Sequence, residues 1–166
     1  EQFFGEKSFE VNDLLRTNEN GEGIASIIRL TDIQDKPKLF STFMLSLLAE
    51  VYAKFPERGD VEQPELIIFL DEAHLIFDSA TKALKDQLES IIKLIRSKGV
   101  GIYFITQIPG DVPENVLSQL GLKIQHALRG FTAKDKKEID KAVENYPMTE
   151  YYNAGQLIQN LGIGRS

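Results

Sequence analysis

The stretch Leu66-Ile67-Ile68-Phe69-Leu70-Asp71-Glu72-Ala73-His74 decides how the rest of this chain is interpreted. Five apolar residues run without interruption into two adjacent carboxylates. A short continuous run that is rich in β-branched and aromatic residues predicts a strand buried on both faces, as at the centre of a parallel sheet. Ligands of open α/β sheets bind beyond the carboxyl ends of the strands, which is where Asp71 and Glu72 are expected to emerge.

Two acids side by side at that edge repel each other and lose hydration, so we expect a cation or an activated water beside them. The pattern resembles the Walker B motif of phosphate-loop ATPases. That resemblance implies that Asp71 holds Mg²⁺ and that Glu72 polarises the water that attacks the γ-phosphate. The pattern is short, and a strand that ends in a solvated acidic turn is the alternative interpretation.

The composition is that of an ordinary globular domain. The chain has 166 residues, of which 42% are hydrophobic and 27% charged, enough for one domain with a core. No apolar run approaches the ~20 residues that span a bilayer, so we expect no membrane association. The net charge of −6 argues against a broad basic surface for nucleic acid. The absence of cysteine excludes a disulfide framework and thiolate metal sites, and it is consistent with a reducing cytoplasm.

Before the central stretch, the chain is irregular and then helical. Residues 1–23 are polar apart from an expected helical turn at Val11–Leu15, and Ile24–Leu30 predicts a strand. Pro37 then begins a helix whose apolar residues recur at helical spacing up to Phe55. The chain also begins without an initiator Met or a signal-peptide pattern, so we expect it to be a piece of a longer protein.

After the central stretch, the pattern is that of a helix followed by a second strand. Asp78 and Ser79 are the expected caps of an amphipathic helix over Leu84–Ile95, which Arg96–Gly99 closes. Val100–Thr106 predicts a second buried strand. Strand, helix and strand together have the length of a parallel crossover connection.

The last third of the chain carries weaker signals. Asp111 and Glu114 have the spacing of a capping box, ahead of a short helix that ends at Gly121. Leu122–Leu128 predicts a strand nearer an edge, and Thr132–Tyr146 predicts a charged helix. Beyond these residues no strong pattern remains.

The alternation of strands and helices predicts an α/β fold with a mostly parallel sheet flanked by helices. We divide the chain into an irregular lead-in over 1–23, a core over 24–146 and a C-terminal extension over 147–166. No Gly-x-x-x-x-Gly-Lys-[Ser/Thr] sequence occurs in the chain, so no loop here is suited to cradle phosphates. If the acidic pair belongs to an ATPase, its phosphate loop is expected upstream of Glu1.

Asp71-Glu72-Ala73-His74 also spells the box of the DEAH helicases. In those enzymes a Ser-Ala-Thr motif closes the next strand, whereas Ser79-Ala80-Thr81 stands in a helix-entry loop here. The next strand ends instead in Thr106-Gln107, which resembles the HerA/FtsK group of RecA-like translocases. That resemblance implies that Gln107 senses the γ-phosphate, because its amide can donate to phosphate and accept from water. A polar strand end without a catalytic role is the alternative.

Four separated blocks, in order, resemble the bacterial HerA-like helicase family. They are Phe69–Phe77, Leu94–Gly101, Thr106-Gln107 and Gln125–Arg129. The resemblance implies a RecA-like core with an upstream phosphate loop, ATP as substrate, Mg²⁺ as cofactor, and homo-oligomeric, hexameric rings that move along DNA. Without the phosphate loop, we expect this chain alone to fold but to neither bind nor hydrolyse ATP.

Ring ATPases complete their active site with an arginine from a neighbouring subunit, and two arginines are candidates for that role. Arg96 stands at a helix end before the second strand, and Arg129 follows the predicted edge strand. Arg96 is equally well explained as a partner of the helix dipole. His74 is expected to pack or hydrogen-bond near the site without binding metal, because no second His lies nearby. Lys134–Lys137 is interpreted as a solvated helix face.

These features predict the Walker B and sensor half of a cytoplasmic, Mg²⁺-dependent ATPase of the HerA-like translocase or helicase type. Two alternatives stay open. One is a secretion or conjugation motor of the same superfamily. The other is an assembly or regulatory module that keeps the fold without hydrolysis, and the intact acidic pair argues against it.

Overall fold

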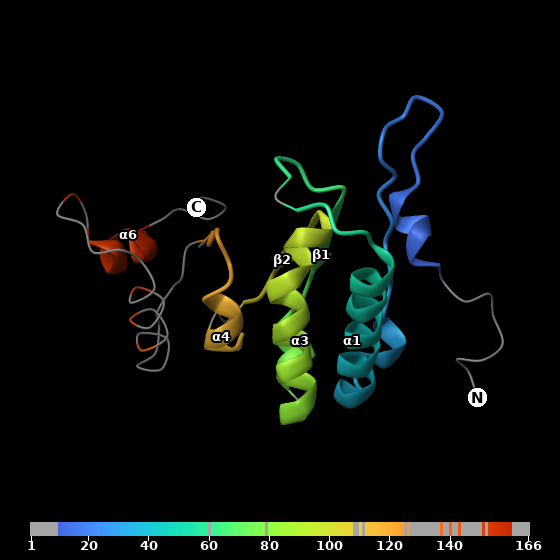
Figure 1. Ribbon diagram of the computed structural model, residues 1–166. Coiled ribbons are helices and arrows are strands. Elements are labelled where there is room, and N and C mark those ends of the chain that lie inside the picture. Colours follow the sequence, from blue (N-terminus) through green and yellow to red (C-terminus); the bar gives the residue numbers. More distant parts are fainter. Residues whose placement is uncertain are drawn as a thin grey trace. The chain divides into compact units, whose positions relative to one another are not determined.

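The computed structural model describes most of the chain up to residue 126 and one helix near its end. The described residues are 10–59, 61–78, 80–107, 110, 112–124, 126, 137, 140, 143, 151 and 153–160. The chain divides into two compact units, Glu1–Ile105 and Thr106–Ser166, and each is described by itself (Figure 1). In the part of the chain that the structure describes, no helix has the length and apolarity needed to cross a membrane.

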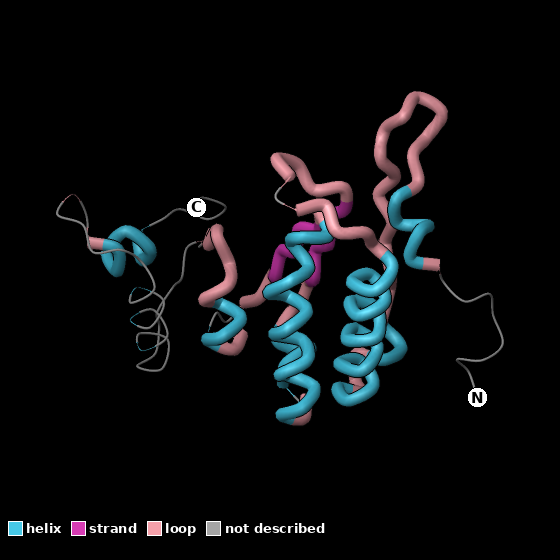
Figure 2. Tube along the Cα trace, viewed as in Figure 1, coloured by secondary structure: helices cyan, strands magenta, loops and turns pink. Residues whose placement is uncertain are grey.

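The first unit is built on two parallel strands, β1 (Leu66–Leu70) and β2 (Val100–Phe104). They pair in register, from Leu66 opposite Val100 to Leu70 opposite Phe104. Two long helices, α1 (Pro37–Lys54) and α3 (Lys82–Leu94), lie side by side in Figures 1 and 2, where α3 stands in front of the strands and α1 to its right. The predicted α/β class and the parallel strand–helix–strand unit are therefore confirmed.

Short helical elements connect these parts. In the first unit they are the 3-10 helices η1 (Val11–Leu15), η2 (Thr31–Ile33) and η3 (Ile95–Lys98), and the five-residue α-helix α2 (His74–Asp78). The second unit contains α4 (Glu114–Leu117) and α6 (Ala154–Asn160). The predicted helical turn at Val11–Leu15 and the predicted start of α1 at Pro37 are both confirmed.

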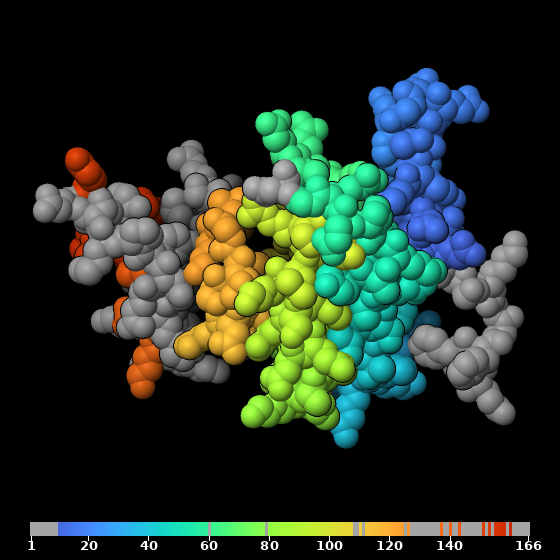
Figure 3. Space-filling model, viewed as in Figure 1, coloured from blue at the N-terminus to red at the C-terminus, as the bar shows by residue number. Residues whose placement is uncertain are grey.

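The core of the first unit lies between the helices and one face of the sheet. The buried apolar side chains of α1 recur every three or four residues, so they form one stripe: Phe40, Met44, Leu47, Leu48 and Val51. From α3, Leu88 and Ile92 are buried, and Figure 3 shows the two helices in close contact. Burial of one such side chain stabilises the fold by roughly 1.5–3 kcal/mol.

The other face of the sheet is exposed. The β1 side chains alternate, so that Ile67 and Phe69 are 46% and 64% exposed whereas Leu70 is 7% exposed. The Phe69 ring stacks on the ring of Tyr103 from β2, with the centroids 4.9 Å apart. The prediction that β1 is buried on both faces is therefore wrong for the described residues, because their helices pack on one side only.

The strand predicted at Ile24–Leu30 does not form. The backbone N–H of Ile24 still donates to the carbonyl of Arg16, beside an isolated antiparallel bridge between Thr17 and Gly23. This hairpin is the narrow blue arm of Figure 3. Beyond it, Ile27 is 87% exposed and the chain is irregular. An extended apolar run becomes a strand only beside a hydrogen-bonded neighbour, and the described residues place no strand there.

Helix caps were also predicted in the wrong places. The cap of α3 is Thr81, whose hydroxyl oxygen accepts from the backbone N–H of Leu84, whereas Asp78 ends the preceding helix α2. Ser79 lies outside the described residues. Gly99 closes η3 in the left-handed conformation, as the sequence predicted.

In the second unit, the predictions are only partly covered. Pro113 precedes α4, so this helix begins at Glu114 without a side-chain cap, and Asp111 lies outside the described residues. Residues 122–124 and 126 form no strand. Most of the helix predicted over 132–146 lies outside the described residues, although positions 137, 140 and 143 are helical.

Candidate functional site

The two acids of the central stretch lie in a tight turn between β1 and α2. Leu70 ends the strand in the core, Asp71–Ala73 forms the turn, and α2 begins at His74. Asp71 is exposed, Glu72 is half-buried and Ala73 is completely buried. The strand end thus delivers both carboxylates to the carboxyl edge of the sheet, as the sequence predicted.

Glu72 has an unusual backbone conformation. Its φ angle is +50°, the only positive φ among the described residues other than glycine. This region costs a residue with a side chain roughly 1–2 kcal/mol, so the surrounding structure must hold it. Backbone strain of this kind is concentrated at functional sites.

Three hydrogen bonds hold the turn in place. The backbone N–H of Glu72 donates to Oδ1 of Asp71 at 3.0 Å. The N–H of Ala73 donates to the carbonyl of Ile105 at 2.9 Å, and the N–H of Ile105 donates back to the carbonyl of Leu70, also at 2.9 Å. Ile105 follows β2 directly, so the acidic turn is fastened to the chain that leaves the second strand.

His74 completes the cluster. Its ring nitrogen Nδ1 lies 3.3 Å from the carboxylate oxygen Oε2 of Glu72, and the two side chains are 29% and 37% exposed. The structure therefore brings Asp71, Glu72 and His74 together at one edge. His74 was expected to pack or hydrogen-bond near the site, and the side chain that it contacts is Glu72.

The other predicted site residues are Gln107, Arg129 and Arg96. Gln107 is exposed and belongs to the second unit, three residues after the end of β2, and its sensor role stays a prediction. Arg129 lies outside the described residues. Arg96 is exposed on η3, just before β2 begins, whereas Glu72 follows the end of the parallel strand β1.

Arg96 and Glu72 are therefore at opposite ends of the sheet. The strands are five residues long, and a strand rises about 3.3 Å per residue, so roughly 15 Å of strand separates the two positions. An arginine side chain does not span this distance. Within one subunit, Arg96 does not reach the carboxylate turn.

A magnesium ion fits this site only if most of its ligands are waters and substrate phosphates. Among the described residues there is no group of three or more His, Asp or Glu side chains that could hold a metal. Mg²⁺ commonly binds through one or two carboxylates together with waters and substrate phosphates. The exposed Asp71 carboxylate at the strand end matches that mode.

Two features of the site were not found from sequence. One is the left-handed conformation of Glu72, since an Asp-Glu pair at a strand end carries no glycine or asparagine to signal it. The other is the bond from Ala73 to Ile105, which depends on the register between β1 and β2. The His74–Glu72 contact had a weak signal, since the two residues are only two positions apart at a helix start.

Comparisons with known proteins agree with the resemblance stated above. The whole chain, residues 1–166, matches the family described as helicase HerA-like C-terminal. A protein of Methanocaldococcus jannaschii described as a probable helicase is 32% identical over 130 residues, which cover 72% of this chain and 24% of that protein. The chain thus spans about a quarter of the length of the curated relative it matches. No solved structure matches the chain. This chain belongs to the HerA-like helicase C-terminal family.

Proposed function

We propose that this chain, as a member of that family, supplies the Walker B half of the active site of an ATP-hydrolysing DNA translocase or helicase. The observation that carries the proposal is the turn Asp71–Ala73, where two adjacent carboxylates lie at the carboxyl edge of parallel strands. Ligand sites of α/β sheets lie at this edge. The strained backbone of Glu72 favours a functional turn over a solvated acidic loop.

Glu72 is the proposed general base. In hydrolysis, the oxygen of a water forms a bond to the γ-phosphorus while the bond from that phosphorus to the β–γ bridging oxygen breaks, and ADP leaves. The Glu72 carboxylate accepts a proton from the attacking water and returns it to solvent. A half-buried carboxylate at the strand end suits this role, because a general base must lie within hydrogen-bond reach of the proton it takes.

Asp71 is the proposed partner of Mg²⁺. When bound, the ion would neutralise charge on the phosphates, and Asp71 would hold it through one exposed carboxylate, directly or through water. Gln107 is proposed to contact the γ-phosphate through its amide. The phosphate loop that this site requires is expected from another part of the full-length protein.

The position of Arg96 supports a role across a subunit boundary. It is exposed and lies at the end of the sheet opposite Glu72, so we assign it to the site of a neighbouring subunit of a ring rather than to its own site. Arg129 remains the second candidate. A homo-oligomeric, hexameric ring on DNA is part of the proposal, and membership of the helicase family supports it.

The proposal is tested by Glu72→Gln in the full-length protein. Loss of a positioned general base lowers a rate by typically 10²–10⁴-fold, so steady-state ATPase activity is expected to fall by about that factor. Binding of Mg²⁺-ATP, measured by calorimetry, is expected to persist. The matched control is Glu65→Gln, which changes an exposed carboxylate ahead of β1 and is expected to leave turnover unchanged. A Glu72→Gln rate within a few-fold of wild type contradicts the assignment.

The trans arginine has its own experiment. Arg96→Ala and Glu72→Gln subunits are each expected to be inactive as uniform rings and to regain activity when mixed, because some interfaces then combine an intact arginine with an intact base. The same mixing is done with Arg129→Ala. If confirmed mixed rings show no activity above that of the separate variants, neither arginine acts in trans.

A further inference from the structure

Glu72 and His74 form a contact that the proposed mechanism does not use. Nδ1 of His74 lies 3.3 Å from Oε2 of Glu72. An ionised carboxylate only accepts hydrogen bonds, so Nδ1 acts as a donor to Glu72 in the ring form that carries its hydrogen on Nδ1. The contact joins a side chain in a strained turn to the first residue of a helix.

The helix that carries His74 is firmly anchored. Ile76 and Phe77 of α2 are each 1% exposed. The Phe77 ring packs against the Phe104 ring of β2, with the ring centroids 6.1 Å apart. The hydroxyl of Ser41, itself fully buried in α1, donates to the carbonyl of Pro37 at 2.8 Å and also lies 3.4 Å from the carbonyl of Leu75, which it contacts across the two helices. The backbone of His74 therefore has a fixed position relative to the sheet.

The Glu72 carboxylate stands at the end of a long side chain. The side chain has several rotatable bonds, and holding such a side chain in one rotamer has an entropic cost. A general base must nevertheless stay within hydrogen-bond reach of the attacking water. A fixed donor on an anchored helix supplies that restraint.

We propose that His74 is a positioning residue, which holds the Glu72 carboxylate in the orientation required for water activation. This inference rests on the proposed function of Glu72. Misplacement of a reacting group by about 1 Å can lower a rate by about 100-fold. Loss of the His74 donor is accordingly expected to lower kcat by about 10–100-fold and to leave the KM for ATP within a few-fold of wild type, because His74 is not proposed to touch the nucleotide.

The experiment compares three substitutions of His74 in the full-length protein. Ala removes the donor. Asn places an amide nitrogen near the position of Nδ1 and restores a donor toward Glu72, whereas the amide of Gln corresponds to the more distant Nε2. We expect kcat to fall in His74→Ala and His74→Gln and to recover in His74→Asn. Asp78→Asn, at the exposed end of the same helix, is the matched control and is expected to keep the wild-type kcat.

A double-mutant cycle separates positioning from a general structural role. If His74 acts only through the Glu72 carboxylate, His74→Ala causes no further loss of single-turnover rate in a Glu72→Gln background. Thermal denaturation of each variant shows whether the fold is retained, and the Asn-against-Gln comparison keeps the test valid if the Ala variant does not fold.

The outcomes distinguish this inference from the proposed function. An inactive Glu72→Gln variant together with equal kcat for His74→Asn and His74→Gln overturns the positioning role alone. An additive loss in the double variant also overturns it. A Glu72→Gln variant with wild-type turnover overturns the proposed function itself, and the positioning role with it.

Discussion

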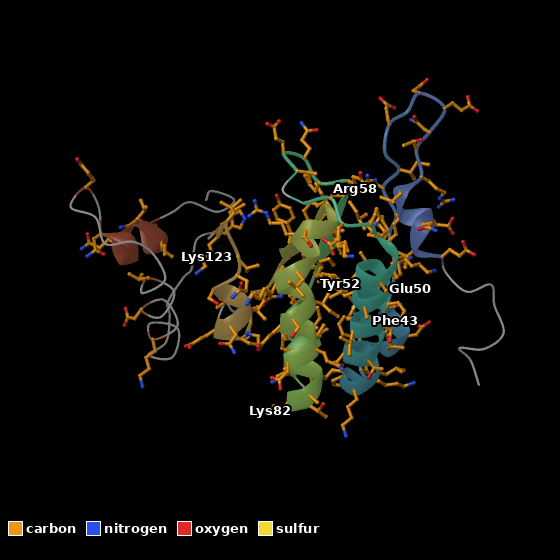
Figure 4. The ribbon with its side chains drawn as sticks, in the orientation of Figure 1. Phe43, Glu50, Tyr52, Arg58, Lys82 and Lys123 are labelled. Atoms are coloured by element: carbon orange, nitrogen blue, oxygen red, sulfur yellow. The ribbon has the colours of Figure 1, made fainter. Side chains whose placement is uncertain are left out.

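The two ends of the β1–β2 sheet both carry charged side chains, in opposite arrangements. Where the strands begin, charges are paired: Lys98 lies 2.9 Å from Glu57 and Arg58 lies 3.0 Å from Glu65. The Lys98 ammonium also stands over the Tyr52 ring, 4.9 Å from its centroid. Figure 4 shows Tyr52 and Arg58 at this end of the unit, with Lys82 at the other.

Where the strands end, the charges and the backbone conformation are unfavourable for stability. Asp71 and Glu72 are adjacent acids, and the positive φ of +50° falls on a glutamate. At the beginning of β2 the positive φ of +72° falls on Gly99, where it costs little. The comparison teaches that the first end carries interactions that stabilise the fold, whereas the second end carries a strained, acidic turn whose features agree with the proposed catalytic role.

The largest expected difference between the two ends is in catalysis. Asp71→Asn in the full-length protein is expected to raise the Mg²⁺ concentration needed for ATPase activity by at least about 100-fold, since even outer partners of metal ligands contribute about 10–100-fold. Glu65→Gln, at the other end, is expected to leave it unchanged. Magnesium titrations of ATPase activity measure the Mg²⁺ requirement of both variants. Equal shifts in Asp71→Asn and Glu65→Gln would contradict the assignment of the metal to the strand end.

The second difference is in backbone strain. Gly99→Ala is expected to lower the free energy of unfolding by about 1–2 kcal/mol, because its φ is positive. The added Cβ would meet Arg58 at 3.6 Å, an ordinary contact, so the cost comes from the backbone. Glu72→Gly is expected to raise the free energy of unfolding by up to about 1 kcal/mol, through relief of strain.

Urea denaturation of the variants measures these two changes. Glu72→Ala is the control for the second, since it removes the carboxylate but keeps a residue with a Cβ at positive φ. A rise in stability in Glu72→Ala equal to that in Glu72→Gly would mean that the carboxylate, and not the backbone, destabilises the turn.

The third difference concerns the paired charges. Lys98→Met keeps most of the side-chain stem but removes the ammonium over Tyr52, and the lost cation–π contact is expected to lower the free energy of unfolding by about 0.5–1 kcal/mol. Lys54→Met, which breaks an exposed ion pair with Glu50, is the control and is expected to have a smaller effect. Equal effects would argue that Tyr52 contributes nothing to the interaction.

The smallest expected effect is a pH dependence at the same end. The hydrogen bond from Lys98, and a second from Ser97, lower the pKa of the exposed Glu57 carboxyl below its ordinary value. Its contribution to stability is therefore present above the unfolded-state pKa and is lost as the pH falls through the lowered, folded-state pKa. At pH 7 we expect wild type to have a higher melting temperature than Glu57→Gln. In strong acid this difference should vanish. A difference that persists in acid would show that the charge of Glu57 is not its cause.

The periodicity of apolar residues correctly predicted the two long helices, each of which buries one stripe of side chains. The helix from Pro37 and the amphipathic helix before Gly99 were found because their apolar residues recur at helical spacing, which a single chain segment displays in full. Ile24–Leu30 was mispredicted because an apolar run does not show whether a partner strand exists beside it. The cap of α3 was misplaced by two to three residues because several polar residues before the helix are chemically able to cap it.

By itself, the sequence determined that two acids follow an apolar strand, that a crossover returns a second parallel strand, and that the chain resembles HerA-like helicases. These properties depend on residue order and periodicity alone. The tertiary structure decided that Ile105 fastens the acidic turn, that His74 reaches Glu72, and that Arg96 lies at the far end of the sheet. Each of these depends on the register and direction of two strands that are separated by a helix, because only their pairing fixes which residues end at the same edge.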